Sequence, residues 1–161
     1  MRQCDEDFAR VVLPHARSLL RFARRLTGDR FHAEDLVQET LLLAWRGFGQ
    51  FEPGTNEHAW LFRILMNLFR QQKRKGRSSF AAEPLDRAAQ ATLPSAHESL
   101  EVMQAFERLG GEQRTVLLLA VVEGFKCREI SEILEIPIGT VMSRLSRARE
   151  VMRELLSEVV R

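Results

Sequence analysis

The sequence predicts an all-α protein of two small helical domains joined by a flexible linker, with a helix-turn-helix in the second domain. The 161 residues include only 9 Gly and 5 Pro, which is few for a chain rich in β-turns. Apolar residues recur at spacings of three and four on both sides of the middle of the chain. Between these stretches, residues 76–97 are rich in Ala, Ser and Pro and keep no period, which predicts a linker.

The first domain, residues 1–75, is expected to contain three helices. The first ends at Gly28, and its apolar stripe consists of Phe8, Val12, His15, Leu19, Phe22 and Leu26. The second starts near His32, with Glu34 and Asp35 in its first turn, where the helix dipole favours acids. Its inner stripe consists of Ala33, Val37, Thr40, Ala44 and Phe48. A loop over 47–57 precedes the third helix, which runs from 57 to about 75 and ends basic.

The second domain, residues 98–161, is expected to contain four helices. A short helix through Phe106 is broken by Gly110 and Gly111, and another helix covers 112–122. Residues 126–134 and 138–159 form the last two helices, separated by a turn that ends at Pro137. The inward positions of this pair are Cys127, Ile130, Ile133 and Leu134, then Ile138, Val141, Leu145, Ala148 and Met152.

The composition excludes several classes of protein. The longest apolar run, Val116 to Val122, is far shorter than the roughly 20 residues of a membrane span. The acidic N-terminus has no apolar core of a signal peptide, so we expect a cytoplasmic protein without membrane insertion. Cys4 and Cys127 are too few for a disulfide framework or a zinc knuckle. Scattered histidines and the lack of a Gly-rich phosphate loop predict no metal, no cofactor and no enzyme activity.

The last helix pair has the pattern of a DNA-binding helix-turn-helix. The face opposite its apolar stripe presents hydroxyls and guanidinium groups at Thr140, Ser143, Arg144, Arg147 and Arg149. A major groove accepts such a helix, because Arg pairs with guanine edges or phosphates and Ser or Thr bonds either. The pattern also fits two packed helices with a solvated Arg-rich face.

The stretch 58–79, which covers the third helix of the first domain and the residues just after it, carries six cations and no acid. The cations are Arg63, Arg70, Lys73, Arg74, Lys75 and Arg77, and aromatic residues lie among or before them at Phe51, Trp60, Phe62 and Phe69. Cations that follow phosphates and rings that stack on bases are typical of single-strand binding. Core aromatics and a basic helix end that complements the dipole are the alternative.

Three further features have structural explanations when taken alone. Asp35, Gln38 and Glu39 share an outer surface of the second helix, which by itself suits a solvated acidic face. His15 lies on an apolar stripe, a position typical of a histidine in the core or at its boundary. Cys127 suits a small buried apolar residue, with redox sensing as the minor alternative.

Together these segments resemble the extracytoplasmic-function (ECF) sigma factors of bacterial RNA polymerase over nearly the whole chain. In the first domain the resemblance rests on residues 33–40, 44–46 and 59–64 with Asn67. In the second it rests on residues 112–114, 123–125, 129–130, 136–141, 143–145 and 147–149.

The resemblance implies a transcription initiation factor whose partners are core RNA polymerase (β′ and β subunits), promoter DNA and an anti-sigma factor. It assigns the contact with the β′ coiled coil to Asp35, Gln38 and Glu39. It assigns recognition and melting of the minus-ten element to Phe51, Thr55, Asn56, Trp60, Arg63, Asn67, Arg70, Lys73 and Arg74. It assigns the minus-thirty-five element to Thr140, Met142, Ser143, Arg144, Ser146 and Arg147, with Thr140 and Arg144 nearer phosphates.

The chain departs from the family where Gly110 and Gly111 replace a proline-containing turn, and where Met142 and Ser146 stand at positions that are often larger or charged. No promoter sequence is therefore implied. Two other functions remain open: a sigma-mimicking protein that titrates an anti-sigma factor without touching DNA, and a stand-alone helix-turn-helix regulator that binds DNA as a dimer.

Overall fold

The structure is a computed structural model that describes residues 2–76 and 96–159, with side chains for 5–76 and 101–157. Every regular element in the described residues is a helix, so the all-α prediction is confirmed. The chain divides into two compact units, Met1–Asp86 and Arg87–Arg161. Most of the expected linker, residues 77–95, lies outside the described part. Within the expected linker range, Ala96 and His97 already belong to the first helix of the second unit.

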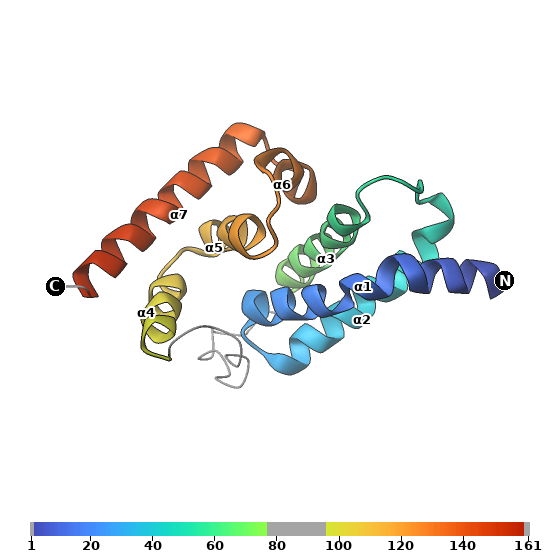
Figure 1. The fold of residues 1–161 in the computed structure, drawn as a ribbon, viewed down its shortest axis with the longest axis horizontal. Helices are drawn as coiled ribbons and strands as arrows, with labels where there is room; N and C mark the ends of the chain where they lie inside the picture. Colours follow the sequence, from blue (N-terminus) through green and yellow to red (C-terminus); the bar gives the residue numbers. More distant parts are fainter. Residues whose placement is uncertain (1, 77–95, 160–161) are drawn as a thin grey trace. The chain divides into compact units, whose positions relative to one another are not determined.

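The N-terminal unit consists of α1 (Arg2–Thr27), α2 (Arg30–Gly47), the short 3-10 helix η1 (Phe48–Gln50) and α3 (Glu57–Arg74). In Figure 1, α1 and α2 lie side by side and α3 packs against both of them. The rings of Phe22 and Phe62 meet edge to face at 5.0 Å in the centre, and both are fully buried. Leu19, Leu36 and Leu65 surround them with no exposed surface. Burying each such side chain stabilises the unit by about 1.5–3 kcal/mol.

A tight junction joins α1 to α2. Gly28 has φ +70° and donates its N–H to the Arg24 carbonyl at 2.9 Å, as expected of a C-terminal glycine cap. Asp29 then caps α2 by accepting the His32 N–H at 2.6 Å. Because of this cap α2 begins at Arg30, earlier than the sequence pattern indicated, and its first turn holds no acid. The expected inner stripe is buried up to Ala44, whereas Phe48 lies in η1 and is half-buried.

Two histidines stack between α1 and α3. The rings of His15 and His58 are 5.0 Å apart and nearly parallel, and His15 Nε2 lies 3.8 Å from Glu57 Oε1. Burial lowers the pKa of His15 below 6.5, the charge of His58 lowers it further, and Glu57 acts in the opposite direction. His15 is half-buried, in keeping with the boundary position expected for it.

The lowered pKa of His15 makes the stability of the N-terminal unit dependent on pH. The unfolded chain protonates His15 more readily than the folded unit does, so the contribution is complete above pH 6.5 and is lost as pH falls below it. Urea unfolding followed by Trp fluorescence reports this unit alone, because both tryptophans, Trp45 and Trp60, lie in it. We expect a lower free energy of unfolding at about pH 5.5 than at about pH 7.5, and a smaller difference in His15→Gln. An unchanged pH dependence in His15→Gln would exclude His15 as its source.

The C-terminal unit consists of α4 (Ala96–Glu107), α5 (Gly111–Leu117), the π-helical segment η3 (Leu118–Val122), α6 (Cys127–Leu134) and α7 (Ile138–Val159). The long helix α7 packs against α4, α5 and α6 (Figure 1). The helix expected over 112–122 is present as α5 and η3, and its second half has π-helical hydrogen bonding. The Glu123 N–H reaches the Leu118 carbonyl at 3.2 Å, and Gly124, with φ +73°, then turns the chain so that Phe125 is buried.

The helix-turn-helix predicted from the sequence is formed by α6 and α7. Glu129 Oε2 accepts the Lys126 N–H at 2.7 Å at the start of α6, and Glu135, with φ +54°, ends that helix. Ser131 Oγ donates to the Ile136 carbonyl at 2.6 Å and fixes the turn before α7. One inward assignment was wrong, because Ile138, the first residue of α7, is 46% exposed. Cys127 and Met152 are half-buried.

Candidate functional sites

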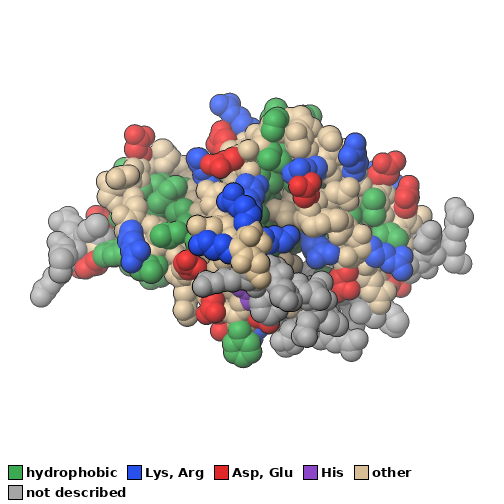
Figure 2. All heavy atoms as spheres, turned by 180° about the vertical axis from the view of Figure 1, so that it is seen from behind, with side chains coloured by type: hydrophobic (Ala, Val, Ile, Leu, Met, Phe, Trp, Pro, Cys, Tyr) green, Lys and Arg blue, Asp and Glu red, His purple; other side chains and the backbone are tan. Residues whose placement is uncertain are grey.

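The outer face of α2 is the first candidate surface. Asp35, Gln38 and Glu39 are all exposed on it, as predicted from their spacing. Among these polar residues two large apolar side chains also reach solvent, Phe31 at 76% exposure and Leu42 at 48%. An acidic face with interspersed exposed apolar groups suits a protein partner better than plain solvation does. Figure 2 shows that hydrophobic and charged side chains lie next to one another on the surface of the described residues.

We call this α2 surface the acidic-apolar face, defined by Phe31, Asp35, Gln38, Glu39, Leu42 and Trp45. Phe31 and Leu42 were not predicted, because the helical period identifies the inner stripe of α2 and does not mark single exposed apolar residues. Their positions relative to Asp35 and Gln38 follow alternating steps of four and three. That spacing places them on the exposed side of the helix.

Aromatic residues form a connected cluster beside the loop that precedes α3. The rings of Phe51 and Trp60 lie 4.7 Å apart, and Phe51 stacks on Phe48 at 6.0 Å. Phe8 joins the cluster through edge-to-face contacts with Phe48 at 5.3 Å and Trp45 at 5.1 Å. Phe51 and Trp60 are half-buried, so they pack against other rings and also show part of their surface to solvent. These two rings are therefore partly core, and stacking of their exposed surface on bases stays a prediction.

The polar residues of this loop also bond locally. Thr55 Oγ1 donates to the Glu52 carbonyl at 2.7 Å, and Asn56 Oδ1 accepts the Ala59 N–H at 3.0 Å as the N-cap of α3. Both side chains are exposed. The loop geometry is therefore held by two of the residues that the resemblance assigns to base contacts.

One side of α3 forms a basic track, defined by Arg63, Asn67, Arg70, Lys73 and Arg74. All of these are exposed except Arg70, which is half-buried. The opposite side packs Leu61, Phe62, Leu65, Met66, Leu68 and Phe69 into the core. Lys73 Nζ lies 5.5 Å from the centre of the Phe69 ring, so its stem covers the core while its charge faces solvent. The track extends over about 16 Å at 1.5 Å per residue, enough to follow several phosphates.

On α7 the predicted DNA-contact residues divide into two groups. Met142, Ser143, Ser146 and Arg147 are exposed, and Met142 reaches 57% exposure. Thr140 is half-buried, and Arg144 is only 24% exposed because its Nη2 forms an ion pair with Glu112 Oε2 of α5 at 2.9 Å. Arg144 therefore ties α7 to α5, a role that the sequence pattern did not indicate.

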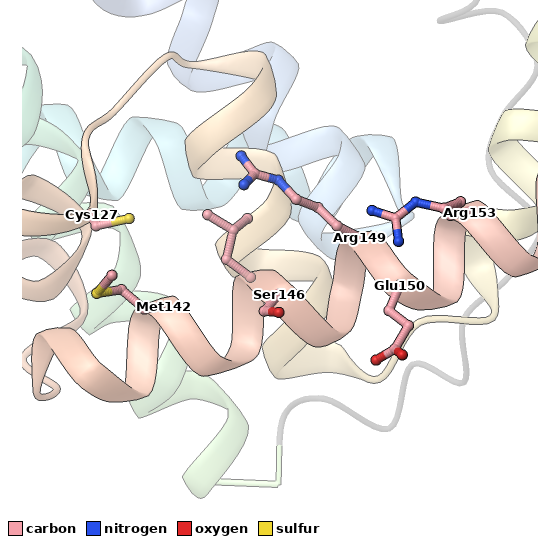
Figure 3. A pocket seen from close by; sticks show the side chains of 7 residues that line it. Cys127, Met142, Ser146, Arg149, Glu150 and Arg153 are labelled. Carbon is pink, nitrogen blue, oxygen red and sulfur yellow. The ribbon is translucent and has the colours of Figure 1, made fainter.

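A pocket of about 420 Å³ lies beside the exposed face of α7 (Figure 3). Its lining consists of Cys127, Met142, Leu145, Ser146, Arg149, Glu150 and Arg153. Met142 and Ser146 thus belong both to this hollow and to the predicted base-contact set. Arg149 and Arg153 give it a basic wall further along α7, which suits a phosphate flanking the groove.

Within the described ranges no cluster of three or more His, Cys, Asp or Glu residues has the arrangement of a metal site. Within the same ranges, no helix combines the length and the apolar character that a bilayer span requires.

Known families match both units. The family model Sigma-70 region 2 matches residues 11–79, and the family model Sigma-70, region 4 matches residues 99–152. A relative, the ECF RNA polymerase sigma factor EcfG of Rhodopseudomonas palustris (strain TIE-1), is 40% identical over 151 residues, which cover 90% of this chain and 82% of that protein.

Solved structures agree with these matches. The sigma factor RpoE in complex with the anti-sigma factor NepR from Bartonella quintana gives a TM-score of 0.78 at 35% identity, covering 94% of this chain and 98% of that chain. CnrH in complex with the cytosolic domain of CnrY gives a TM-score of 0.71 at 27% identity, covering 96% and 90%. The two helical units, their matched regions and these similarities show that the chain belongs to the ECF sigma factors of RNA polymerase.

Proposed function

We propose that this sigma factor binds core RNA polymerase through the acidic-apolar face of α2 and contacts promoter DNA through α3 and α7. The supporting observation is the opposite chemistry of two helices of one unit. α2 exposes Asp35 and Glu39 with apolar neighbours, whereas α3 exposes the basic track. A protein that bound only DNA would gain nothing from an acidic outer helix, since phosphates repel carboxylates.

The minus-thirty-five element is contacted as a duplex by α7. Ser143, Ser146 and Arg147 present a hydroxyl-rich and cationic surface to the major groove, and Met142 offers an apolar contact such as a thymine methyl. Arg144, held by Glu112, fixes the angle of α7 on α5 and stands next to these residues. The pocket beside Met142 receives the adjoining sugar-phosphate backbone.

The minus-ten element is opened by the N-terminal unit. Unstacking a base costs a few kcal/mol, which binding to the separated strand offsets. The loop that contains Thr55 and Asn56 captures a displaced base beside the aromatic cluster, with Asn67 as a further polar contact. The basic track then follows the phosphates of the single strand. No bond is made or broken, so the protein acts by binding and not as an enzyme.

An anti-sigma factor controls this activity. The sigma factor itself acts in the cytoplasm, where the polymerase is found. RpoE from Bartonella quintana was solved in complex with the anti-sigma factor NepR, and CnrH in complex with the cytosolic domain of CnrY. Phe31, Leu42 and Trp45 supply exposed apolar surface for an inhibitor on the acidic-apolar face. An inhibitor seated there competes directly with polymerase.

A gel shift with and without core polymerase distinguishes this function from the alternatives. The probe is a duplex enriched from random sequences by the protein together with core polymerase. We expect a shift that requires core polymerase, because a second site on a separate unit has a low effective concentration until polymerase holds both units. Tight binding by the protein alone would indicate a stand-alone helix-turn-helix regulator. Failure of the protein with core polymerase to enrich any duplex over core polymerase alone would indicate a sigma-mimicking titrator.

A further inference from the structure

Two side-chain hydrogen bonds connect the end of α3 to α2, and one of them reaches the acidic-apolar face. His32 Nε2 and Gln72 Oε1 lie 2.8 Å apart, and Gln72 Nε2 donates to Glu39 Oε2 at 3.2 Å. The direction of the first bond follows from the second. A carboxylate only accepts, so the Gln72 amide nitrogen must face Glu39, its oxygen faces His32, and His32 Nε2 carries the proton.

These two bonds link His32, which is fixed at the start of α2, through Gln72 to the exposed side chain of Glu39. The backbone N–H of His32 is bonded to the Asp29 cap at 2.6 Å, and the His32 and Gln72 side chains are half-buried. Glu39 is exposed and belongs to the acidic-apolar face. A free surface glutamate samples many rotamers, and a partner that binds it must restrict them at a cost in free energy. A bond from a fixed amide removes part of that cost before binding.

We propose that Gln72 is a positioning residue that holds the Glu39 carboxylate in the orientation in which core polymerase binds it. This inference rests on the proposed function of the acidic-apolar face. It assigns to α3, otherwise the DNA-contacting helix, a second role in polymerase affinity. The amide of Gln72 acts only through Glu39 and touches no polymerase atom itself.

The adjacent glutamine provides a matched control. Gln71 is exposed on the same turn of α3, and within the described residues its side chain forms no hydrogen bond to α2. Gln72→Met and Gln71→Met each remove one side-chain amide and keep a side chain of nearly the same length. The measurement is the dissociation constant of the full chain for core polymerase, with Trp fluorescence unfolding as a check on the N-terminal unit.

Gln72→Met is expected to weaken core binding about 3-fold, the effect of one exposed hydrogen bond, while Gln71→Met leaves it unchanged. In a Glu39→Ala background, Gln72→Met should have no further effect, since the group that it positions is gone. A purely structural role would instead weaken binding equally in both backgrounds and lower the stability of the unit.

Two results would overturn the inference, and they are distinguishable. If Glu39→Ala weakens core binding but Gln72→Met behaves as Gln71→Met does, the polymerase face stands and the positioning role of Gln72 is wrong. If Glu39→Ala itself leaves core binding unchanged, Glu39 is no polymerase contact and the assignment of the acidic-apolar face fails together with the role of Gln72.

Discussion

Replacing Arg144 and Arg147 together with alanine is expected to abolish promoter-specific transcription while core polymerase binding survives. An arginine that contacts a base edge contributes about 1–3 kcal/mol, so loss of Arg147 alone lowers duplex affinity by about 5- to 150-fold, and loss of Arg144 adds to it by releasing α7 from Glu112. Arg147 is exposed for direct contact, and Arg144 keeps α7 in place through Glu112. Run-off transcription with core polymerase measures the loss, and a pull-down of core polymerase measures the retained binding.

Two further variants separate the roles of the two arginines. Arg147→Ala should lower promoter affinity without affecting the stability of the C-terminal unit, whereas Arg144→Ala should affect both, because Glu112 loses its partner. Arg128→Ala is the matched control, since Arg128 is a highly exposed arginine on α6 whose ion pair to Glu132 is also exposed. Loss of polymerase binding in the double variant would contradict the assignment of α7 to DNA.

Removing three charges from the basic track is expected to prevent promoter opening. In the variant Arg63→Ala/Lys73→Ala/Arg74→Ala, the salt dependence of single-strand binding should become shallower by about 2 in log–log slope, at about 0.7 for each lost phosphate contact. Core polymerase with this variant should still bind the duplex promoter through α7 but fail to expose the thymines of the minus-ten element. Permanganate reactivity of those thymines measures the opening directly.

The control for this variant removes the same net charge from another helix. Arg10, Arg17 and Arg21 are exposed on α1, and none of them belongs to the basic track. Their triple alanine variant should open the promoter normally. Equal loss of opening in both triple variants would show that overall charge matters and that the track itself does not.

The helical faces of the fold were predictable because burial follows a simple period. Val12, Leu19 and Phe22 on α1 and Val141, Leu145 and Ala148 on α7 are buried as their spacing indicated. The period says nothing about hydrogen-bond register, which is why the π-helical segment from Leu118 to Val122 was missed. Apolar character also gave a wrong prediction of burial at the start of α7, because Ile138 follows the turn and faces solvent.

The candidate surfaces were predictable to the extent that each lies on one helix. Asp35, Gln38 and Glu39 share a face because of their spacing alone, and the basic residues of α3 do so as well. Contacts between elements distant in the sequence leave no local signal. The ion pair of Arg144 with Glu112 and the bond of Gln72 to Glu39 are of this kind, and both emerge only once the helices are packed.

Titration of the purified protein with bacterial core RNA polymerase, followed by transcription from a selected promoter fragment, tests the central claim most directly. We expect a saturable complex that yields transcripts of defined start, and we expect Asp35→Ala/Glu39→Ala to weaken the complex about 10-fold or more. If the unaltered protein does not associate with core polymerase at all, the assignment of its surfaces to transcription initiation is wrong.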